Sequence, residues 1–291
     1  MDALPYLKRR FRALYPLTFL SAMLSVLVSI IDRLFWQGAI FNRAVDFYTI
    51  WLSATFTSKG WVETAFVNHA IWYMTVLWLC ILLYYIVVRV SKESDNRYYA
   101  LCVFFVILGW ICIRKAVDIP FLTYYNGRGY LAFFMGALLW EYQTLHGRRE
   151  RCLFSTSIAV VLMLLMVLSY IYGKWVVVGD IILAWSLFIA PGMLLVVPNV
   201  PPVSKLLSLK PFICLSKVST CLFLFQGFAY DLVKMVDHGC HMNLDYTSLL
   251  CFIIIMGLVG LSALLAHVLF ENRLIPYLLA ELDALRARDI A

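Results

Sequence analysis

The chain has 291 residues, of which 63% are hydrophobic and only 14% are charged, and its mean hydropathy is +0.85. Soluble domains average about 45–50% apolar and about 25% charged residues, so this chain has too little polar surface to coat a soluble fold. The net charge of +7 comes from cations at the ends of apolar segments, a pattern of membrane proteins and not of nucleic-acid-binding faces. The composition therefore predicts an integral membrane protein embedded in a lipid bilayer, with no nucleic-acid partner.

Apolar runs long enough to cross a bilayer recur along the whole chain. A helix needs about 20 apolar residues to span a hydrocarbon core of about 30 Å, and in that core only helices or closed barrels satisfy the backbone. These runs are too long and continuous for barrel strands, so we predict an all-α, polytopic transmembrane helical bundle of about eight spans. The expected spans are residues 13–31, 70–88, 98–113, 129–145, 153–172, 176–198, 213–234 and 247–270.

The distribution of Lys and Arg predicts the orientation of these spans. If the N-terminus is cytoplasmic, the Lys and Arg residues of the inner segments outnumber those of the outer segments, as the positive-inside rule requires. We therefore expect both termini on the inner side. The longest connection, residues 32–69, contains AVDFYTIWLSATF, which is apolar enough to lie at the outer interface but too interrupted to span.

The cysteines indicate no metal centre and no disulfide framework. The chain has eight cysteines but no C-x-x-C pair, and most lie inside apolar runs, where cysteine acts as a small buried hydrophobe. The segment DHGCHMNLD contains metal-ligating residue types, but their spacing matches no established zinc pattern. We therefore expect no bound metal.

The stretch KRRFR at residues 8–12 supplies Arg9, Arg10 and Arg12 immediately before the first span. One interpretation is an anchor, in which the arginines reach the anionic headgroups of the inner leaflet. The other is phosphate binding, because guanidinium groups match phosphate oxygens in bidentate pairs. Both interpretations remain open from the residues alone.

Three titratable residues are candidates for a catalytic base. His267 and Glu271 are four residues apart and share a helix face, so they could act as a base and the group that orients it; a cap at the inner end of the last span is the alternative. His69 precedes the second span beside Trp72 and Tyr73, where an interfacial role is the alternative.

Polar and aromatic residues suggest where a hydroxyl-bearing ligand could bind. Tyr125 and Arg128 lie in an outer TYYNGRG stretch suited to stacking on a sugar, although an aromatic belt at the interface explains them equally well. Gln226 lies inside a span, where a polar side chain usually faces a cavity or a helix partner.

Five stretches, in this order, resemble the acyltransferase-3 family of membrane proteins. YLKRRFRALYPLTFL resembles the basic segment before the family's third span, and AIWYMTVLWLCILLYYIV its Trp-containing span. GRGYLAFFMGALL resembles its Phe-Phe-x-Gly span, KVSTCLFLFQGFAYDLV its "KISYSIYLWHFPV" segment, and HVLFENRLIP its closing Phe-Glu-x-Pro end. The sequence departs from the family at Thr75-Val76-Leu77, where Ser-x-Glu is frequent, and at Gln226, where His is frequent.

The resemblance implies a function and a set of roles. It implies an enzyme that uses acyl-CoA, typically acetyl-CoA, as co-substrate, with no bound cofactor. Its Arg-x-Arg pair, which contacts the acyl donor, maps to Arg10 and Arg12, with Arg9 beside them. Trp72, Tyr73, Tyr125, Arg128 and Gln226 become the expected acceptor pocket. The domain would cover residues 1–272 with a short cytoplasmic amphipathic tail at 273–291, and the family's first two spans, which carry its proposed catalytic His, would precede residue 1.

We therefore expect a membrane O-acyltransferase, in its common form an O-acetyltransferase, that modifies a hydroxyl of envelope or exported carbohydrate. The resemblance also implies the plasma (inner) membrane of a bacterium. Two alternatives remain: a catalytically inactive partner or truncated homologue, and a small-molecule transporter, for which Pro191-Gly192 is the single helix-breaking point near a midplane.

Overall fold

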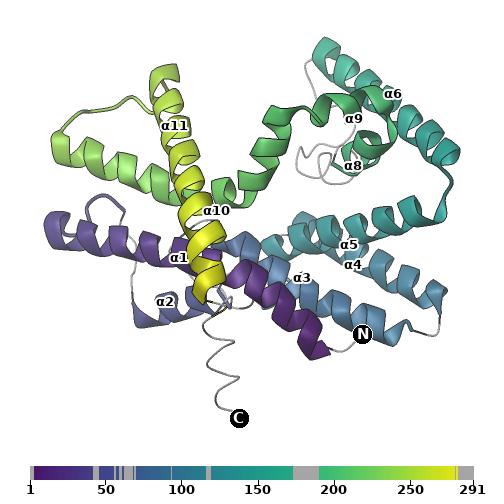
Figure 1. Ribbon diagram of the computed structural model, residues 1–291, viewed down its shortest axis with the longest axis horizontal. Coiled ribbons are helices and arrows are strands. Elements are labelled where there is room, and N and C mark those ends of the chain that lie inside the picture. The colour runs from purple at the N-terminus through teal and green to yellow at the C-terminus, as the bar shows by residue number, and fades with distance from the viewer. Residues whose placement is uncertain are drawn as a thin grey trace. The chain divides into compact units, whose positions relative to one another are not determined.

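The computed structural model describes residues 3–41, 46–55, 57–58, 61, 68, 70–92, 94–115, 119–172, 190–278 and 280. Within these ranges the chain is helical and has no strand (Figure 1), which confirms the predicted all-α class. The elements are α1 (Ala3–Trp36), α2 (Phe47–Ala54), α3 (Ile71–Val90), α4 (Asp95–Lys115), α5 (Tyr124–Leu145), α6 (Arg148–Tyr172), α8 (Ala190–Asn199), α9 (Pro201–Leu207), α10 (Lys210–Cys240), α11 (Leu249–Leu265) and the π-helix η2 (Ala266–Leu274).

Five helices in the described part of the chain are long and apolar enough to cross a membrane. They are α1, α3, α4, α10 and the continuous helix formed by α11 and η2 as far as Leu278, and each coincides with a predicted span. The predicted spans 129–145 and 153–172 fall on α5 and α6, and most of 176–198 lies outside the described residues. The helical membrane bundle is thus supported, and the number of eight spans stays a prediction.

Helix α1 is longer than the predicted span 13–31. Its 34 residues extend over about 50 Å at a rise of about 1.5 Å per residue, whereas a hydrocarbon core is about 30 Å thick. The basic stretch at residues 8–12 is therefore part of the helix, and it lies on a turn that extends beyond the apolar core. The backbone at the arginines is consequently fixed by helical hydrogen bonds.

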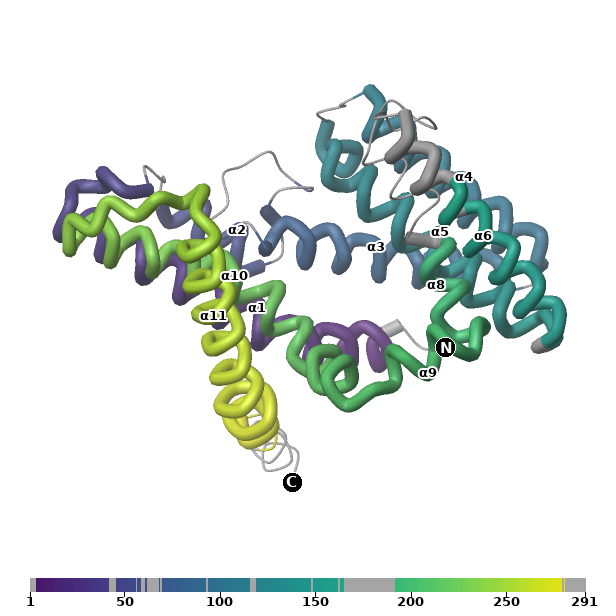
Figure 2. Tube along the Cα trace, turned by 90° about the horizontal axis from the view of Figure 1, so that it is seen from above, coloured from purple at the N-terminus to yellow at the C-terminus, as the bar shows by residue number. Residues whose placement is uncertain are grey.

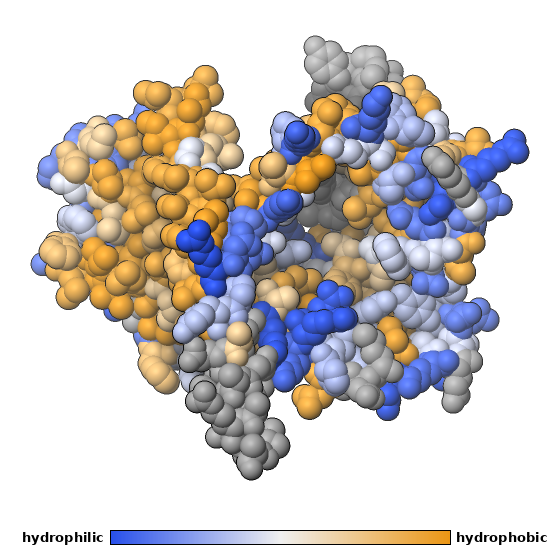
Figure 3. Space-filling view, viewed as in Figure 1, coloured by the Kyte–Doolittle hydropathy of each residue, from blue (hydrophilic) through white to orange (hydrophobic). Residues whose placement is uncertain are grey.

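The chain folds into two compact units. Unit 1 comprises residues Met1–Thr75 and Leu215–Ala291, and unit 2 comprises Val76–Cys214. In unit 1, α10 and α11 present apolar side chains to the surface (orange in Figure 3), among them Phe252, Ile253 and Leu261. Such an apolar exterior fits a helix that faces lipid.

A buried polar network joins α1 to α10 in unit 1, where the two helices lie side by side (Figure 2). The Ser21 hydroxyl donates to the Leu224 carbonyl over 2.8 Å, and the Asn68 amide donates to Ser21 Oγ at 2.7 Å and to the same carbonyl at 3.2 Å. Asn68 Oδ1 accepts from the Ala70 backbone. Because lipid offers no hydrophobic driving force between helices, such interhelical hydrogen bonds hold membrane helices together.

In unit 2, α4 and α5 approach closely through two glycines. A Cβ atom added at Gly109 would lie 2.7 Å from the Gly127 carbonyl oxygen, and one at Gly127 would lie 2.7 Å from the Gly109 carbonyl oxygen. Small residues that let helix backbones meet are typical of membrane bundles. Next to this contact, Thr123 and Asn126 form a capping box that begins α5.

The predicted interfacial segment in residues 32–69 contains the short helix α2. Asp46 caps its N-terminus by accepting a 2.8 Å hydrogen bond from the Thr49 backbone. Hydrogen bonding from Thr49 also holds the pKa of Asp46 below its usual value.

Candidate functional site

The clearest chemical feature of unit 1 is a hydrogen-bonded pair on the π-helix. His267 Nδ1 lies 2.8 Å from Glu271 Oε2, so the contact predicted from their spacing is present. Both residues lie on η2, and π-helical segments within α-helices occur frequently at functional sites. The helix α11 continues into η2 without a break, so both residues lie on a continuous, hydrogen-bonded helix.

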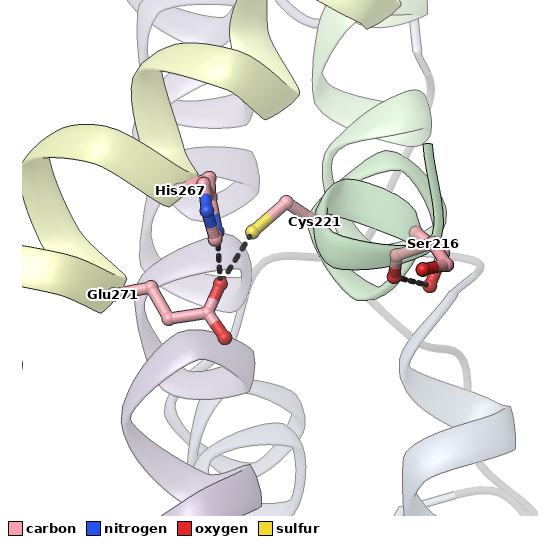
Figure 4. A network of polar contacts seen from close by, with 5 residues as sticks. Ser216, Cys221, His267 and Glu271 are labelled. Carbon is pink, nitrogen blue, oxygen red and sulfur yellow. Dashed lines mark hydrogen bonds and ion pairs between the residues drawn. The ribbon is translucent and has the colours of Figure 1, made fainter. Parts of the chain in front are cut away.

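A third side chain joins this pair from α10 (Figure 4). Cys221 Sγ lies 3.4 Å from the same oxygen, Glu271 Oε2, and donates its S–H to it. Cys221 is fully buried, whereas the side chains of His267 and Glu271 are 19% and 42% exposed. The carboxylate is therefore fixed from two directions, while the imidazole keeps an accessible edge.

This arrangement can transfer a proton. When Nδ1–H donates to the carboxylate, the other ring nitrogen, Nε2, carries the lone pair that can accept a proton. An adjacent carboxylate stabilises the imidazolium that then forms, and it holds the ring in one orientation. The pair thus has the geometry of a base and its positioning group.

The same three residues are of types that bind metal, since one ligand atom from each lies within 4.8 Å of the other two. A tetrahedral zinc ion with Zn–N and Zn–O bonds of about 2.1 Å keeps those ligand atoms about 3.4 Å apart. The 2.8 Å separation of Nδ1 and Oε2 instead corresponds to a direct hydrogen bond. We therefore interpret the trio as a proton-transfer site.

An apolar groove of about 530 Å³ lies beside η2. We call it the α1–η2 groove. Its residues on α1 recur every three or four positions and so share one face of that helix. They are Lys8, Phe11, Arg12, Tyr15, Pro16, Phe19 and Leu20. The facing wall consists of Phe270, Leu274, Ile275 and Leu278.

The α1 wall of the groove is an aromatic ladder with cations at one end. Stacked rings run from Phe11 to Tyr15, with centroids 4.4 Å apart, and from Tyr15 to Phe19, at 5.7 Å. Lys8 and Arg12 are four residues apart at the N-terminal end of this wall. The groove is therefore apolar along its length and positively charged at its mouth.

The side chains of the arginines predicted to bind the donor lie on different faces of α1. Arg12 lines the groove, whereas Arg10 lies with its guanidinium carbon 5.5 Å from the centre of the Tyr6 ring. Residues two positions apart on an α-helix are rotated by about 200° around its axis. The side chains of Arg10 and Arg12 therefore lie on opposite faces of α1. Arg9 is exposed. Within the predicted cluster, Arg12 is the residue that the structure places at a cavity, together with Lys8.

The residues predicted for an acceptor pocket are distributed over both units. In unit 1 the Tyr73 ring contacts Phe223 edge-on at 5.0 Å and also packs on Trp72, and Gln226 is exposed on α10. Tyr125 and Arg128 lie in the first turns of α5 in unit 2. Within unit 1, the groove contains none of Trp72, Tyr73 and Gln226. The remaining base candidate, His69, lies outside the described residues.

Two contributors to this region were not predicted as site residues. Cys221 was interpreted only as a buried hydrophobe, and the sequence places it 50 residues before Glu271. Lys8 was treated as part of a basic cluster, although its spacing of four from Arg12 indicates a shared helix face. Helical spacing could have found Lys8, but nothing local points to Cys221.

The chain matches the family model described as "Acyltransferase domain" over residues 1–267. This match covers most of the chain, and the protein therefore belongs to the acyltransferase-3 family. It carries a membrane acyltransferase domain, as the ordered motifs predicted. No curated protein and no solved structure gives a significant match. His267 is the last residue of the matched range, and Glu271 lies four residues beyond it.

Proposed function

We propose that this protein is an O-acyltransferase that moves an acyl group from acyl-CoA to a hydroxyl of envelope or exported carbohydrate. The observation that carries the proposal is the presence, on one element of unit 1, of both the His267–Glu271 pair and a wall of the α1–η2 groove. Acyl transfer from a thioester to an alcohol is accelerated by a base that takes up the hydroxyl proton, and cations at the mouth of the groove suit an anionic acyl donor. Family membership supports the reaction class.

In the proposed reaction, His267 Nε2 removes the proton from the acceptor hydroxyl as its oxygen attacks the thioester carbonyl carbon. The resulting tetrahedral intermediate collapses by breaking the carbon–sulfur bond. The leaving coenzyme A sulfur takes the proton back from the imidazolium, which leaves an ester and free coenzyme A thiol. Glu271 stabilises the imidazolium between the two proton transfers, and Cys221 holds the carboxylate in place.

Lys8 and Arg12 are proposed to bind phosphate groups of the donor at the mouth of the groove. Coenzyme A carries three phosphates, and it is a cytoplasmic molecule. The positive-inside pattern predicts that the N-terminal end of α1 lies on that side. Arg12 supplies the planar fork that matches phosphate oxygens, and Lys8 supplies a mobile point charge.

The test is acyl transfer by the full chain in membranes supplied with radiolabelled acyl-CoA and envelope carbohydrate. A positioned base typically contributes about 10²–10⁴-fold to rate, so His267→Gln should lose at least about a hundredfold. His146→Gln, which changes an exposed His at the C-cap of α5 in unit 2 whose ring nitrogen lies 3.1 Å from the Tyr142 carbonyl oxygen, is the matched control and should keep wild-type activity. Equal activity in His267→Gln and wild type would exclude His267 as the base. Donor binding without transfer by the wild type would favour an inactive partner.

A further inference from the structure

A polar pocket of about 300 Å³ lies in unit 1, at the end of α1 opposite to Lys8 and Arg12. We call it the α10 pocket, and its polar lining consists of Lys234, Asp237, His238, His241, Asn243 and Tyr246. We propose that this pocket binds a phosphate group, carried by a phospholipid headgroup or by a soluble phosphate ester. The inference is independent of the proposed acyl transfer.

The pocket lies where α1 and α10 end on the same side of unit 1. The Ser21 hydroxyl bonds to the Leu224 carbonyl, and about 15 residues, or about 22 Å, further along both helices the Trp36 ring contacts His238 edge-on. The two helices therefore run parallel, as Figure 2 shows. The positive-inside pattern predicts that they end on the outer side, where tryptophan typically marks the level of the lipid headgroups.

Asp237 holds the segment that follows α10 against the end of this helix. Its Oδ1 accepts a 2.9 Å hydrogen bond from the Leu244 backbone, and its Oδ2 accepts a 2.8 Å hydrogen bond from the Tyr246 hydroxyl. Both oxygens of the acid in the pocket lining are thus engaged by the loop. The fold of this loop brings His241 and Asn243 to the pocket.

Three basic side chains of the pocket have no hydrogen-bond acceptor. Within the part of the chain that the structure describes, no hydrogen bond or ion pair engages the side-chain nitrogens of Lys234, His238 and His241. The half-buried Lys234 ammonium lies 4.8 Å from the centre of the Tyr230 ring, and the His238 ring contacts Trp36. A partly buried cation gains from an anionic partner, and ammonium and imidazole N–H groups donate to phosphate oxygens.

A metal ion suits the pocket less well than an anion. Among the described residues, the trio on α10 and η2 is the group of three ligand atoms within 4.8 Å of one another. The ligand atoms of Asp237, His238 and His241 therefore do not converge on one point. Lys234 would also repel a metal ion, whereas it attracts a phosphate.

The surroundings of the pocket favour a phospholipid as the source of the phosphate. Leu34 and Phe35 in the last turn of α1 are each 74% exposed, and Leu249 at the start of α11 is 73% exposed. These side chains supply apolar contact for acyl chains next to a bound headgroup. A soluble phosphate ester would use the polar pocket alone.

The experiment observes the histidine rings of the full chain by NMR spectroscopy. The chain has five histidines, so labelling of histidine alone gives few signals, which single His→Gln variants assign. The protein is held in dodecyl maltoside, a detergent without phosphate, and the probes are glycerol 3-phosphate, phosphatidylglycerol and the uncharged lipid diacylglycerol. We expect both phosphate compounds to shift the signals of His238 and His241, and diacylglycerol to leave them in place.

Two lysine variants separate the pocket from general effects of charge. Lys234→Gln removes a charge-assisted donor, so it should weaken the binding of both phosphate compounds at least about threefold. Lys210→Gln, which changes an exposed lysine at the other end of α10, is the matched control and should change the binding less than about twofold. An unchanged His267 signal shows that each variant keeps its fold.

The outcomes identify the source of the phosphate and can overturn the site. A response to phosphatidylglycerol that excess glycerol 3-phosphate does not displace would support a phospholipid site, and displacement would support a site for a soluble ester. The inference would be overturned if neither phosphate compound shifted the signals of His238 and His241, if diacylglycerol shifted them equally, or if Lys234→Gln left the response unchanged. Acyl transfer is measured separately, so each of these results leaves the proposed function standing.

Discussion

Glu271 Oε2 accepts hydrogen bonds from two helices, one from His267 Nδ1 at 2.8 Å on its own element and one from Cys221 Sγ at 3.4 Å on α10. A carboxylate held in this way can fix the imidazole and stabilise its protonated form. The pairing also ties the end of the last membrane helix to α10. The orientation of the proposed base therefore depends on packing between two spans.

Replacing Glu271 with Gln should lower the rate of acyl transfer without weakening the binding of acyl-CoA. Gln keeps the size of the side chain but removes the charge that stabilises the imidazolium. We expect kcat to fall about a hundredfold, with the KM for acyl-CoA changed less than threefold because the groove is intact. Glu150→Gln, on an exposed acid at the start of α6, should leave both constants unchanged. An unchanged kcat in Glu271→Gln would remove Glu271 from the mechanism.

The two arginines of the Arg-x-Arg pair should differ in their effect on donor binding. Arg12→Lys keeps the charge but loses the bidentate fork, and a charge-assisted hydrogen bond contributes about 1.5–3 kcal/mol. We therefore expect acyl-CoA to bind about tenfold more weakly or worse. Arg10 leaves the opposite face of α1, beside Tyr6, so Arg10→Lys should change the affinity less than twofold. Binding constants for both variants, at equal levels in the membrane, check this; equal effects would contradict the assignment.

Ser21 should matter for stability. Its hydroxyl donates to the Leu224 carbonyl of α10 and accepts from the Asn68 amide, so Ser21→Ala breaks the direct bond from α1 to α10 and the bond from Asn68 to α1. Polar contacts between membrane helices contribute about 0.6–1.7 kcal/mol each, and we expect a loss of about 1–2 kcal/mol. Ser157→Ala, which removes an exposed bond within α6, should stay within about 0.5 kcal/mol of wild type. Unfolding in detergent by thermal or denaturant titration measures both.

Gly109 should not tolerate a methyl group. An added Cβ would lie 2.6 Å from the Leu131 backbone nitrogen and 2.7 Å from the Gly127 carbonyl oxygen, so Gly109→Ala must push α4 and α5 apart. Overpacking of this kind costs about 1–3 kcal/mol. Gly136→Ala, on α5, is the matched control and should be neutral or stabilising, because among the described residues no atom beyond the local helix backbone lies within 4 Å of the added Cβ. Equal melting temperatures for the two variants would contradict the close contact.

The helices could be predicted because long apolar runs in a bilayer leave the backbone no other way to satisfy its hydrogen bonds. The contact between His267 and Glu271 was also predictable, since it depends only on a spacing of four within one helix. Cys221 could not be predicted, because its contact with Glu271 depends on how α10 packs against η2. The sequence pattern of Cys221 is that of any cysteine in an apolar span.

The basic stretch shows that residues paired in a motif can lie on different faces of one helix. Arg10 and Arg12 were interpreted as one donor-binding pair because the family pattern names them together. Helix α1 begins at Ala3, ten residues before the predicted span at residue 13, and a continuous helix turns the two side chains to opposite faces. The boundary of a helix beyond its apolar core depends on local backbone hydrogen bonds, which hydropathy does not report.

The most direct test is photocrosslinking with an acetyl-CoA analogue that carries a diazirine on its pantetheine arm. We predict that the label attaches to the two walls of the α1–η2 groove, within residues 11–20 and 270–278, and that Leu274→Trp reduces the labelling. Excess unlabelled acetyl-CoA should compete for this labelling. Labelling confined to other helices, or labelling of these walls that acetyl-CoA fails to displace, would contradict the assignment of the groove as the site of the acyl donor.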